Sequence, residues 1–315
     1  MNYFITGGAG FVGSHLVAKL LNKGHQVTAY DNLILGREAF LKHHTKNPHF
    51  KFIKGDLLDV KTLTQSLKGY DFIFHLAANS DIAPKPTTDT DLKLNTLATY
   101  NVLEAMRLNT IKKIAFSSTS AVYGVPKMVP TPEDYGPLFP ISFYGASKVS
   151  CEALISAFCH NFGMRAWVFR FANIIGKNAT HGVMVDFVKK LQKNPKELEI
   201  LGDGKQKKCY LYIDDCIEGM LFGIGHAHDE LNYFNLATKG NTEVNTIAKT
   251  IIHNMKLKQV TLKYTGGSQG WKGDVPTMEL DCAKLKKLGW KARYTSDEAV
   301  KKGVEEYVKG LKKIH

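Results

Sequence analysis

The sequence predicts an α/β fold, in which a doubly wound parallel sheet is joined to a second, smaller α/β lobe. A glycine-rich turn follows the first apolar run, and apolar runs alternate with amphipathic stretches over the first 170 residues. The length of 315 residues also exceeds what one compact core usually contains. Alternation of this kind is typical of parallel sheets that helices cover on both faces.

A strand is predicted at residues 2–6 and a helix at residues 14–21, with a glycine turn between them. Gly7, Gly10 and Gly13 are spaced three apart in that turn. Because glycine has no side chain, backbone N–H groups and the helix N-terminus can approach a pyrophosphate. The turn is therefore predicted to bind a dinucleotide, through Gly7, Gly10, Phe11 and Val12.

The second predicted strand covers residues 25–30 and ends at Asp31, eighteen residues after Gly13. A carboxylate at this place can accept hydrogen bonds from a ribose 2′-hydroxyl and repels a 2′-phosphate. The sequence therefore predicts NAD rather than NADP.

Further strands are predicted at residues 50–54, 70–76, 112–118 and 165–170, and helices at residues 59–67, 92–109 and from Ser142 onward. Ligands of parallel sheets collect at the carboxyl ends of the strands. Polar or small residues occur at these ends: Asp31, Asp56, Ala77, Ala78, Ser117, Thr119 and Asn173.

Tyr144 and Lys148 are four residues apart at the start of a predicted helix, and this spacing places them on one face. A phenol has a pKa near ~10, so it is a weak base at neutral pH unless a cation favours the phenolate. Lys148 is such a cation, although the same spacing also occurs in exposed surface pairs. The pair is a candidate acid–base site.

Several motifs occur together in the order and spacing of one family: residues 6–13, 31–33, 55–57, 75–78, 95, 117–124, 144 with 148, 170–173, 202–204 and 273–276. On these motifs the chain is identified as a member of the extended short-chain dehydrogenase/reductase family. It resembles the nucleotide-sugar epimerase and dehydratase branch, of which UDP-glucose 4-epimerases are typical. The resemblance covers essentially the whole chain and implies a Rossmann-type fold with NAD as cofactor.

The resemblance implies roles for three side chains. Tyr144 is the base that removes a proton from a sugar hydroxyl while hydride passes to the nicotinamide. Lys148 holds the ribose and lowers the pKa of the phenol. Thr119 forms a hydrogen bond to the reacting hydroxyl, although a hydroxyl at a strand end can also serve as a simple cap.

The resemblance also implies which residues contact NAD. Asp56 and Leu57 are expected at the adenine, and Asn95 and Ser117 on the nicotinamide side. The remaining contacts are expected from Asn32, Leu76, Ala77, Ala78 and Phe171, together with the glycine turn, Asp31, Tyr144 and Lys148.

Residues expected to bind a sugar nucleotide follow from the same resemblance. Asn173 meets the phosphates, and Lys208 stands where the family usually has Arg. A Lys binds phosphate as a point charge without the planar fork of Arg. Trp271 either stacks on the base or packs, and Asp274 belongs to the motif at 273–276. The sugar is expected near Ser80, Thr119, Tyr123, Tyr144 and Val183, and no metal-ligand spacing is present.

The reaction is narrowed by Ala121. Related dehydratases and decarboxylases carry an acid there, which elimination needs and an alanine cannot replace. Reversible oxidation at C4 needs only Tyr144, Lys148, Thr119 and NAD. The prediction is a 4-epimerase of a nucleotide-diphosphate sugar, with UDP-glucose and UDP-galactose as the default pair. A dehydrogenase, a 4-keto-reductase or a dehydratase of the same family is the alternative.

The net charge of +13 leaves a non-catalytic nucleotide- or RNA-binding protein as an alternative of another class. The lysines are spread along the chain, so no nucleic-acid partner is expected. Met1 leads directly into the first strand, no apolar stretch is long enough to span a membrane, and the five cysteines lack CxxC pairing. These features predict a cytoplasmic enzyme.

The predicted nucleotide-binding domain comprises residues 1–173 and 210–241, and the substrate-binding lobe comprises residues 174–209 and 242–315. The resemblance further implies a homodimer, in which residues 92–108 and 144–162 of each subunit form a four-helix interface. The candidate contacts are Leu94, Leu97, Val102, Ala153, Ala157 and Phe158.

Overall fold

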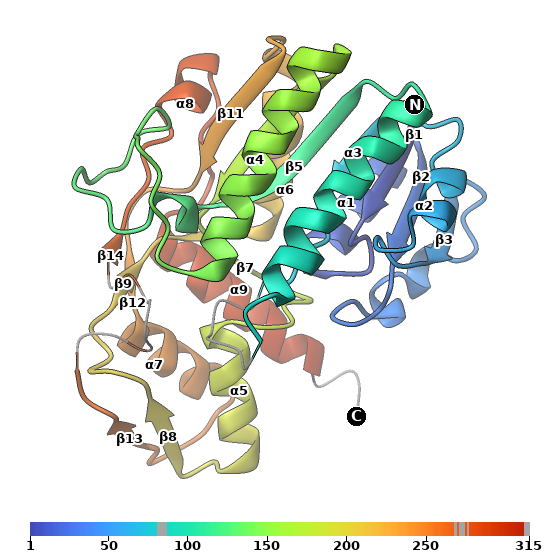
Figure 1. Cartoon of the computed structure of the whole chain (residues 1–315). Coiled ribbons are helices and arrows are strands. Elements are labelled where there is room, and N and C mark those ends of the chain that lie inside the picture. The colour runs from blue at the N-terminus through green and yellow to red at the C-terminus, as the bar shows by residue number, and fades with distance from the viewer. Residues whose placement is uncertain (81–86, 268–269, 271–274, 276, 312–315) are drawn as a thin grey trace. The chain divides into compact units, whose positions relative to one another are not determined.

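A parallel sheet is the centre of the part of the chain that is predicted to bind a nucleotide (Figure 1). The structure, a computed structural model, describes residues 1–80, 87–267, 270, 275 and 277–311. Within these residues the sheet has seven strands in the order β11-β6-β5-β4-β1-β2-β3. Every pair from β3 through β2, β1 and β4 to β5 is parallel. The predicted fold class is therefore confirmed. The strands are β1 (Asn2–Thr6), β2 (Gln26–Asp31), β3 (Phe50–Lys54), β4 (Phe72–His75), β5 (Lys113–Thr119), β6 (Arg165–Phe171) and β11 (Leu231–Leu236).

The accompanying helices are α1 (Phe11–Asn22), α2 (Val60–Ser66), α3 (Ala98–Leu108), α4 (Phe143–Phe162) and α6 (Ile213–His226). Short turns lie at η1 (Glu38–Phe40), η2 (Lys42–His44), η3 (Leu92–Leu97) and η4 (Ser120–Tyr123). The helix predicted over residues 92–109 differs in one respect, because η3 is a wider π-helical turn that leads directly into α3. Asn95 is buried in that turn.

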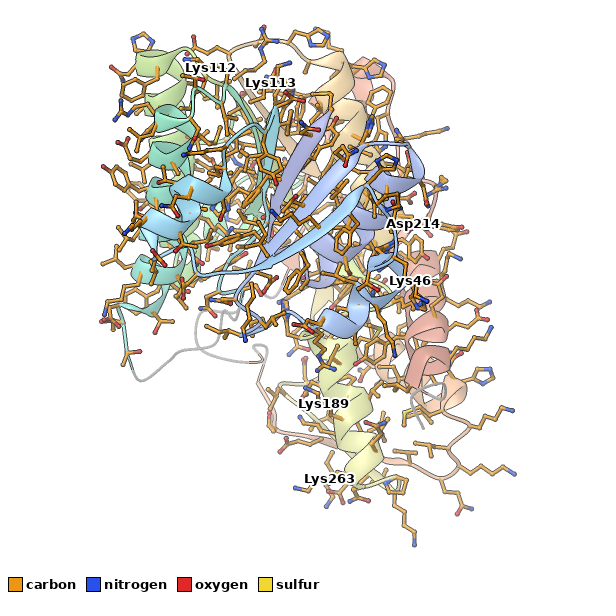
Figure 2. The ribbon with its side chains drawn as sticks, turned by 90° about the vertical axis from the view of Figure 1, so that its right-hand side faces the viewer. Lys46, Lys112, Lys113, Lys189, Asp214 and Lys263 are labelled. Atoms are coloured by element: carbon orange, nitrogen blue, oxygen red, sulfur yellow. The ribbon has the colours of Figure 1, made fainter. Side chains whose placement is uncertain are left out.

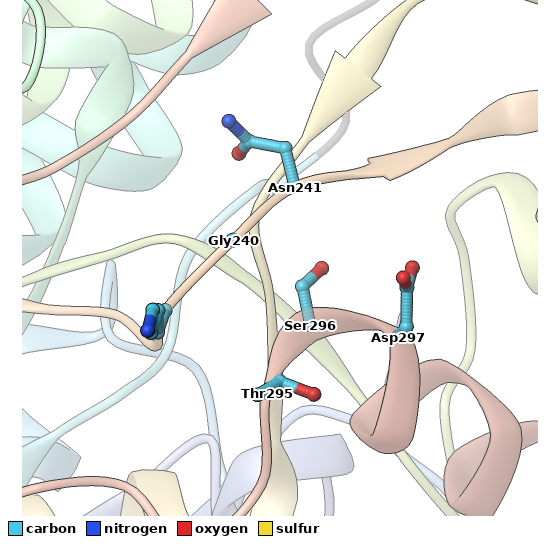
Figure 3. A pocket seen from close by; sticks show the side chains of 6 residues that line it. Gly240, Asn241, Thr295, Ser296 and Asp297 are labelled. Carbon is cyan, nitrogen blue, oxygen red and sulfur yellow. The ribbon is translucent and has the colours of Figure 1, made fainter.

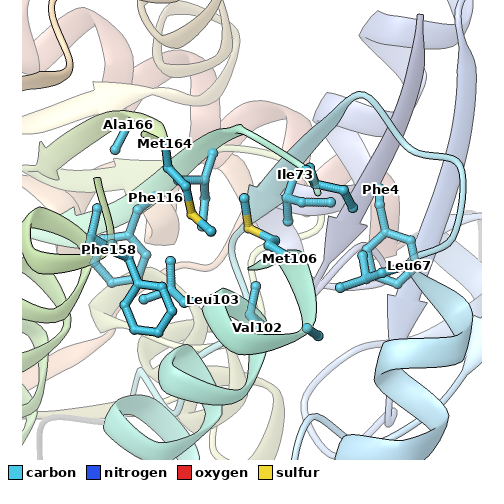
Figure 4. Packing of buried hydrophobic residues seen from close by; sticks show 14 of the residues in the cluster. Phe4, Leu67, Ile73, Val102, Leu103, Met106, Phe116, Phe158, Met164 and Ala166 are labelled. Carbon is cyan, nitrogen blue, oxygen red and sulfur yellow. The ribbon is translucent and has the colours of Figure 1, made fainter. Parts of the chain in front are cut away.

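A hydrophobic core joins α2, α3 and α4 to one face of the sheet (Figure 4). Phe4 and Ile73 of the strands pack with Val102 and Met106 of α3 and with Phe158 of α4. Full burial of one such side chain stabilises the fold by about 1.5–3 kcal/mol. Ile5 alternates with Phe4 along β1 and is also fully buried, so both faces of the strand are covered.

The chain divides into two compact units. The first comprises Met1–Gly124, Gly136–Arg170 and Met220–Phe234, and the second Val125–Tyr135, Phe171–Gly219 and Asn235–His315. The predicted boundaries differ from these units in placing residues 125–135, 171–173, 210–219 and 235–241 with the nucleotide-binding domain.

Small sheets and helices make up the second unit. In it β7 pairs with β10, β9 lies between β12 and β14, and β13 pairs with β8. The elements are β7 (Asn173–Ile175), α5 (Val183–Lys193), β8 (Glu197–Ile200), β9 (Lys207–Lys208), β10 (Tyr210–Tyr212), β12 (Thr242–Glu243), α7 (Val244–Asn254), β13 (Thr261–Tyr264), β14 (Thr277–Met278), α8 (Ala283–Leu288) and α9 (Ser296–Leu311). In the described ranges every helix is too short or too polar to cross a bilayer.

Candidate active site

The glycine turn connects β1 to α1 through a close approach of backbone to backbone. Gly7 has a φ of +69°, which favours glycine. A Cβ on Gly13 would lie 2.1 Å from the carbonyl oxygen of Gly7, so a side chain there would fill the turn. Gly10 caps α1 without a side chain, and Phe11 and Val12 begin the helix. The turn therefore fits the pyrophosphate of a dinucleotide, which needs bare backbone N–H groups at a helix N-terminus.

Asp31 is buried beside this turn at the end of β2. Its carboxylate accepts hydrogen bonds from the backbone N–H of Ala9 at 3.0 Å and of Leu33 at 2.8 Å. Burial raises the pKa of Asp31, and these two bonds partly oppose the effect. A carboxylate has about four acceptor positions, so this one retains capacity for ribose hydroxyls. The residues present fit the predicted NAD.

The residues predicted at the adenine follow β3. Asp56 is half-buried, and its carboxylate accepts a hydrogen bond from the N–H of Leu58 at 2.9 Å. Leu57 packs in the hydrophobic core, where its carbonyl accepts a bond from Asn101 at 2.9 Å. Asn32 is half-buried after β2, and its side chain accepts a bond from the N–H of Ile34 at 3.1 Å.

Tyr144, Lys148 and Thr119 lie together at the carboxyl end of β5. Ser142 caps α4 by accepting a hydrogen bond from the N–H of Gly145 at 3.0 Å, so the helix begins just before Tyr144. Thr119, the last residue of β5, has its hydroxyl close enough to the Tyr144 phenol to lower the pKa of that phenol. The Lys148 ammonium is buried, donates to the carbonyl of Ser117 at 2.7 Å and lies 6.0 Å from the centre of the Tyr144 ring.

The electrostatics of the pair differ from the expectation that Lys148 lowers the pKa of Tyr144. Burial raises the pKa of Tyr144 to about 12, and the neighbouring Thr119 hydroxyl, which lowers this pKa, only partly offsets the effect of burial. Burial also lowers the pKa of Lys148 to about 8. The loss of hydration therefore outweighs the attraction between the phenolate and the ammonium while no further charge is present.

Asn95 lies beneath the start of α4 in a network of buried polar side chains. Its carbonyl oxygen accepts from the N–H of Asn79 at 2.7 Å, and its amide donates to the Ser147 hydroxyl at 2.9 Å. The Ser147 hydroxyl donates in turn to the carbonyl of Tyr144 at 2.8 Å. Asp91 accepts a bond from the Asn79 side chain at 2.6 Å. Asn95 is thus placed to hold the turn of helix that carries Tyr144.

A second buried network lies under the other cofactor candidates. The His75 ring lies 2.6 Å from the Thr6 hydroxyl through Nδ1 and 3.0 Å from the Thr99 hydroxyl through Nε2. Ser117 donates to the His75 carbonyl at 3.4 Å. Leu76, Ala77 and Ala78 follow β4 and are half-buried, as is Phe171 at the end of β6.

The predicted substrate residues fall into different parts of the chain. Ser80 is half-buried after Asn79 in the first unit. In the second unit, Asn173 donates to the carbonyl of Cys209, which follows Lys208, and Val183 begins α5. Trp271 and Asp274 lie outside the described residues. Tyr123 is buried and its hydroxyl accepts a hydrogen bond from Arg170 at 2.9 Å, and its place at the sugar stays a prediction.

A cavity of about 260 Å³ lies in the second unit, before the start of α9 (Figure 3). Its lining residues are Lys239, Gly240, Asn241, Thr295, Ser296 and Asp297. None of them is a predicted site residue, so the candidate site rests on hydrogen-bonded side chains rather than on this cavity.

Glu152 and Arg170 were not among the predicted site residues, although Arg170 is buried, Glu152 is half-buried, and Glu152 contacts Ser118, the neighbour of Thr119. The two residues are eighteen positions apart in the chain. A Glu on one predicted helix and an Arg on a later predicted strand form no sequence motif that would predict their contact. A charged residue within an otherwise apolar strand was the one available signal, because such a charge needs a buried partner.

A parallel sheet with a glycine turn after its first strand, and a buried Tyr, Lys and Thr at a neighbouring strand end, defines a dinucleotide-binding class of enzymes. Comparison of the chain with known protein families supports this assignment. A model of the NAD dependent epimerase/dehydratase family matches residues 3–237. The chain belongs to this family.

Individual relatives show what the chain is similar to. A putative UDP-glucose 4-epimerase of Methanocaldococcus jannaschii is 31% identical over 95% of this chain and 96% of its own length. UDP-glucuronic acid decarboxylase 1 of Arabidopsis thaliana is 30% identical over 96% of this chain and 69% of its own length. A crystal structure of UDP-glucose 4-epimerase with UDP-glucose from Thermotoga maritima superposes with a TM-score of 0.88, at 32% identity, covering 99% of this chain and 100% of that one.

Proposed function

We propose that the protein is an NAD-dependent 4-epimerase of a nucleotide-diphosphate sugar, of the UDP-glucose and UDP-galactose type. The observation that carries the proposal is the Thr119 hydroxyl beside the Tyr144 phenol and the buried Lys148, with Ala121 two residues after Thr119. The Thr119 and Tyr144 side chains can accept and return one proton at one sugar hydroxyl. The alanine offers no second acid or base.

Tyr144 accepts the proton of the C4 hydroxyl and later returns it, while Thr119 holds that oxygen by a hydrogen bond. Bound NAD would supply the hydride chemistry at C4, that is, removal of the hydride and its return to the other face of the ketone. A positive charge beside Tyr144 lowers its pKa from about 12 toward the working range. Lys148, once it turns from the Ser117 carbonyl toward a ribose, adds to that charge.

The same residues support binding of the cofactor and the substrate. Gly7, Gly10, Phe11 and Val12 present backbone to the pyrophosphate, and Asp31 accepts from ribose hydroxyls. Asp56 and Leu57 contact the adenine, and Asn95 and Ser117 contact the nicotinamide side. The remaining cofactor contacts come from Asn32, Leu76, Ala77, Ala78 and Phe171. Asn173 and Lys208 bind the diphosphate, and Ser80 and Val183 contact the sugar, with Trp271 and Asp274 as further candidates.

Ala121 favours epimerisation over the decarboxylase and dehydratase chemistry of some relatives. Elimination needs a proton donor at the leaving hydroxyl and a base at the adjacent carbon. The Ala121 N–H donates to the Thr119 hydroxyl oxygen at 3.2 Å, and its methyl group can do neither task. Oxidation alone or 4-keto reduction uses the same three side chains and is the second candidate.

Charge distribution distinguishes the enzyme from a nucleic-acid-binding protein. Exposed lysines occur on separate elements of both units, among them Lys46, Lys113 at the start of β5, Lys189 on α5 and Lys263 on β13 (Figure 2). Nucleic-acid sites instead gather their basic side chains on one face. A cytoplasmic location remains our proposal, and the five buried free thiols support it.

The proposal is tested by incubating the NAD-loaded protein with UDP-glucose, UDP-N-acetylglucosamine, UDP-glucuronate and GDP-sugars. We expect the C4-inverted product from at least one. Stoichiometric NADH with no inverted sugar would instead indicate a dehydrogenase, and no reaction with any sugar would remove the proposal.

Replacing Tyr144 by Phe removes the proposed base and leaves the ring. We expect turnover to fall by at least about a thousandfold while NAD affinity stays within about threefold. Tyr264→Phe, on an exposed strand of the second unit, is the matched control. Undiminished turnover of the Tyr144→Phe protein would refute the assignment.

We further propose a homodimer that forms through η3, α3 and α4. Leu97, Tyr100 and Leu108 are exposed on the first two elements, and Ala153, Ala157 and Phe162 on α4. The Tyr100 and Phe158 rings pack edge to face at 6.1 Å, which brings the two helices together in one apolar surface. Val102 and Phe158, two of the predicted contacts, are core residues and do not contribute exposed surface.

A further inference from the structure

A buried ion pair lies next to the candidate catalytic residues. The Arg170 guanidinium, on β6, contacts the Glu152 carboxylate, on α4, at 2.7 Å from Nη2 to Oε2, and their side chains are only 8% and 12% exposed. Arg170 Nε adds bonds of 3.1 and 3.2 Å to the two carboxylate oxygens. This forked geometry fixes the two side chains relative to each other more firmly than a single contact would.

The pair also holds the strand end that carries Thr119. Ser118 donates its hydroxyl to Glu152 Oε1 at 2.5 Å, and Ser118 directly precedes Thr119. Arg170 Nη1 donates to the Tyr123 hydroxyl at 2.9 Å, and Tyr123 ends the η4 turn that follows Thr119. The chain is thus held on both sides of Thr119. Ser118 binds Glu152, which is paired with Arg170, and Tyr123 binds Arg170 directly.

The guanidinium also packs against aromatic rings. Its central carbon lies 5.0 Å from the Tyr123 ring and 5.6 Å from the Tyr233 ring. Contacts with Glu152 and Tyr123 keep the pKa of Arg170 above its ordinary range, so the guanidinium stays charged at every working pH.

Glu152 occupies the helix position one turn after Lys148. The two side chains share a face of α4, and the carboxylate favours the protonated ammonium, which raises the pKa of Lys148 against the larger effect of burial. The Arg170 charge compensates that carboxylate. The carboxylate that acts on Lys148 is therefore itself bound to a positive charge.

We propose that Glu152 and Arg170 are positioning residues of the active site: together they hold Thr119 against Tyr144, and Arg170 neutralises the carboxylate that faces Lys148. This inference rests on the proposed acid–base role of Tyr144. The inference has two parts. The pair fixes the position of Thr119 through Tyr123 and Ser118, and it sets the charge of the site through its own two charged groups.

Other charged or titratable groups also face Tyr144 and Lys148. Asp91, which precedes η3, acts on both, and Cys151 of α4 lies beside them. His75 of β4 is close enough for Lys148 to lower its pKa, and Glu152 faces Lys148 from α4. These groups are unchanged in the variants below except for Glu152, so a shift in pH dependence reports on the pair.

The charge effect is tested with Glu152→Gln and the double variant Glu152→Gln/Arg170→Gln. In the single variant the guanidinium is no longer compensated and favours the phenolate. The acid limb of the kcat/KM profile should therefore move to lower pH by about half a unit or more. In the double variant both charges are gone, and the limb should return to within about 0.2 units of the wild-type position.

The geometric effect is tested with Tyr123→Phe, which removes one hydrogen bond and keeps the ion pair. We expect kcat to fall about tenfold with KM for the sugar nearly unchanged. Tyr264→Phe, on the exposed strand β13 of the second unit, is the control and should keep kcat within about twofold. A kcat for Tyr123→Phe equal to that of Tyr264→Phe would overturn the geometric part.

A purely structural role predicts a different result. Breaking a buried pair destabilises a fold, so every variant is also measured by thermal unfolding and NAD binding. Destabilisation alone would lower activity in both the single and the double variant. It would not move the acid limb in Glu152→Gln and return it in the double variant. An unmoved limb in Glu152→Gln would overturn the charge part.

A second measurement separates this inference from the proposed function. Ionisation of Tyr144 is followed by the near-ultraviolet absorbance of tyrosinate in NAD-loaded protein, with Tyr144→Phe as the baseline. The same downward shift is expected for Glu152→Gln. If no sugar is turned over, the 4-epimerase proposal fails, whereas this titration still supports or overturns the role of the pair.

Discussion

Tyr144 is deeply buried, and this sets the conditions under which it can act. Burial raises the pKa of its phenol to about 12, and the nearest cation, Lys148, is engaged with the Ser117 carbonyl. The Tyr144 phenol therefore stays protonated when no cation is bound beside it. The base forms only as charge arrives, which ties proton removal to the loaded state of the site.

His75 provides a prediction about stability. Burial lowers the pKa of His75 to about 3 from the ordinary 6.5. The folded protein then binds fewer protons at His75 than the unfolded chain between these values. Folding free energy is therefore lost as the pH falls through this window. The expected loss from pH 6.5 to pH 5 is about 1.5–2 kcal/mol, measured by urea unfolding.

The control for this prediction is a histidine on the surface. His226 is exposed at the end of α6, and His226→Asn should keep the wild-type slope of stability against pH. His75→Asn should be less stable at every pH, because it disturbs the contacts with Thr6 and Thr99, but its slope should be shallower. An unchanged slope in His75→Asn would assign the acid sensitivity to other groups.

At the scale of elements, the glycine turn leaves no room for a side chain between the end of β1 and the start of α1. A methyl group on Gly13 would lie 2.1 Å from the Gly7 oxygen, so the helix start must move away. We expect Gly13→Ala to lower NAD affinity at least about tenfold and the free energy of unfolding by about 1–3 kcal/mol. Calorimetric titration with NAD measures the first effect.

The matched control for this substitution lies in a helix with space around it. Gly225 is in α6, and apart from its chain neighbours and the nearby backbone of its own helix no atom stands within 4 Å of the Cβ that an alanine would add. Gly225→Ala should leave NAD affinity unchanged and stability equal or slightly higher. Equal affinities for the Gly13→Ala and Gly225→Ala proteins would contradict a pyrophosphate site at the turn.

The sequence predicted most of the sheet because its signals are local. The apolar run Asn2–Thr6 and the glycines after it determine a strand and a turn within a dozen residues. The π-helical turn η3 was missed because its buried Asn95 is held by Asn79 and Ser147, sixteen and fifty-two residues away. The Glu152–Arg170 pair and the raised pKa of Tyr144 were missed for the same reason, since both depend on how distant segments pack.

At the scale of the whole molecule, the apolar surface of η3, α3 and α4 predicts self-association. We expect a dimer in sedimentation velocity at micromolar concentration, and a monomer for Tyr100→Glu, because a carboxylate would be buried in the interface without a partner. Lys249→Glu, on an exposed position of α7, is the control and should remain dimeric. A monomeric wild-type protein would exclude this interface.

The five cysteines are all buried as free thiols. Burial raises the pKa of Cys159 and of Cys209 to about 11 and that of Cys282 to about 12, and it raises the pKa of Cys151 and Cys216 as well. Thiol reagents attack the thiolate, so the native protein should be nearly inert to maleimides. A single cysteine introduced on the surface would then be the site that reacts with a fluorescent label. The native cysteines therefore need not be replaced before such spectroscopy.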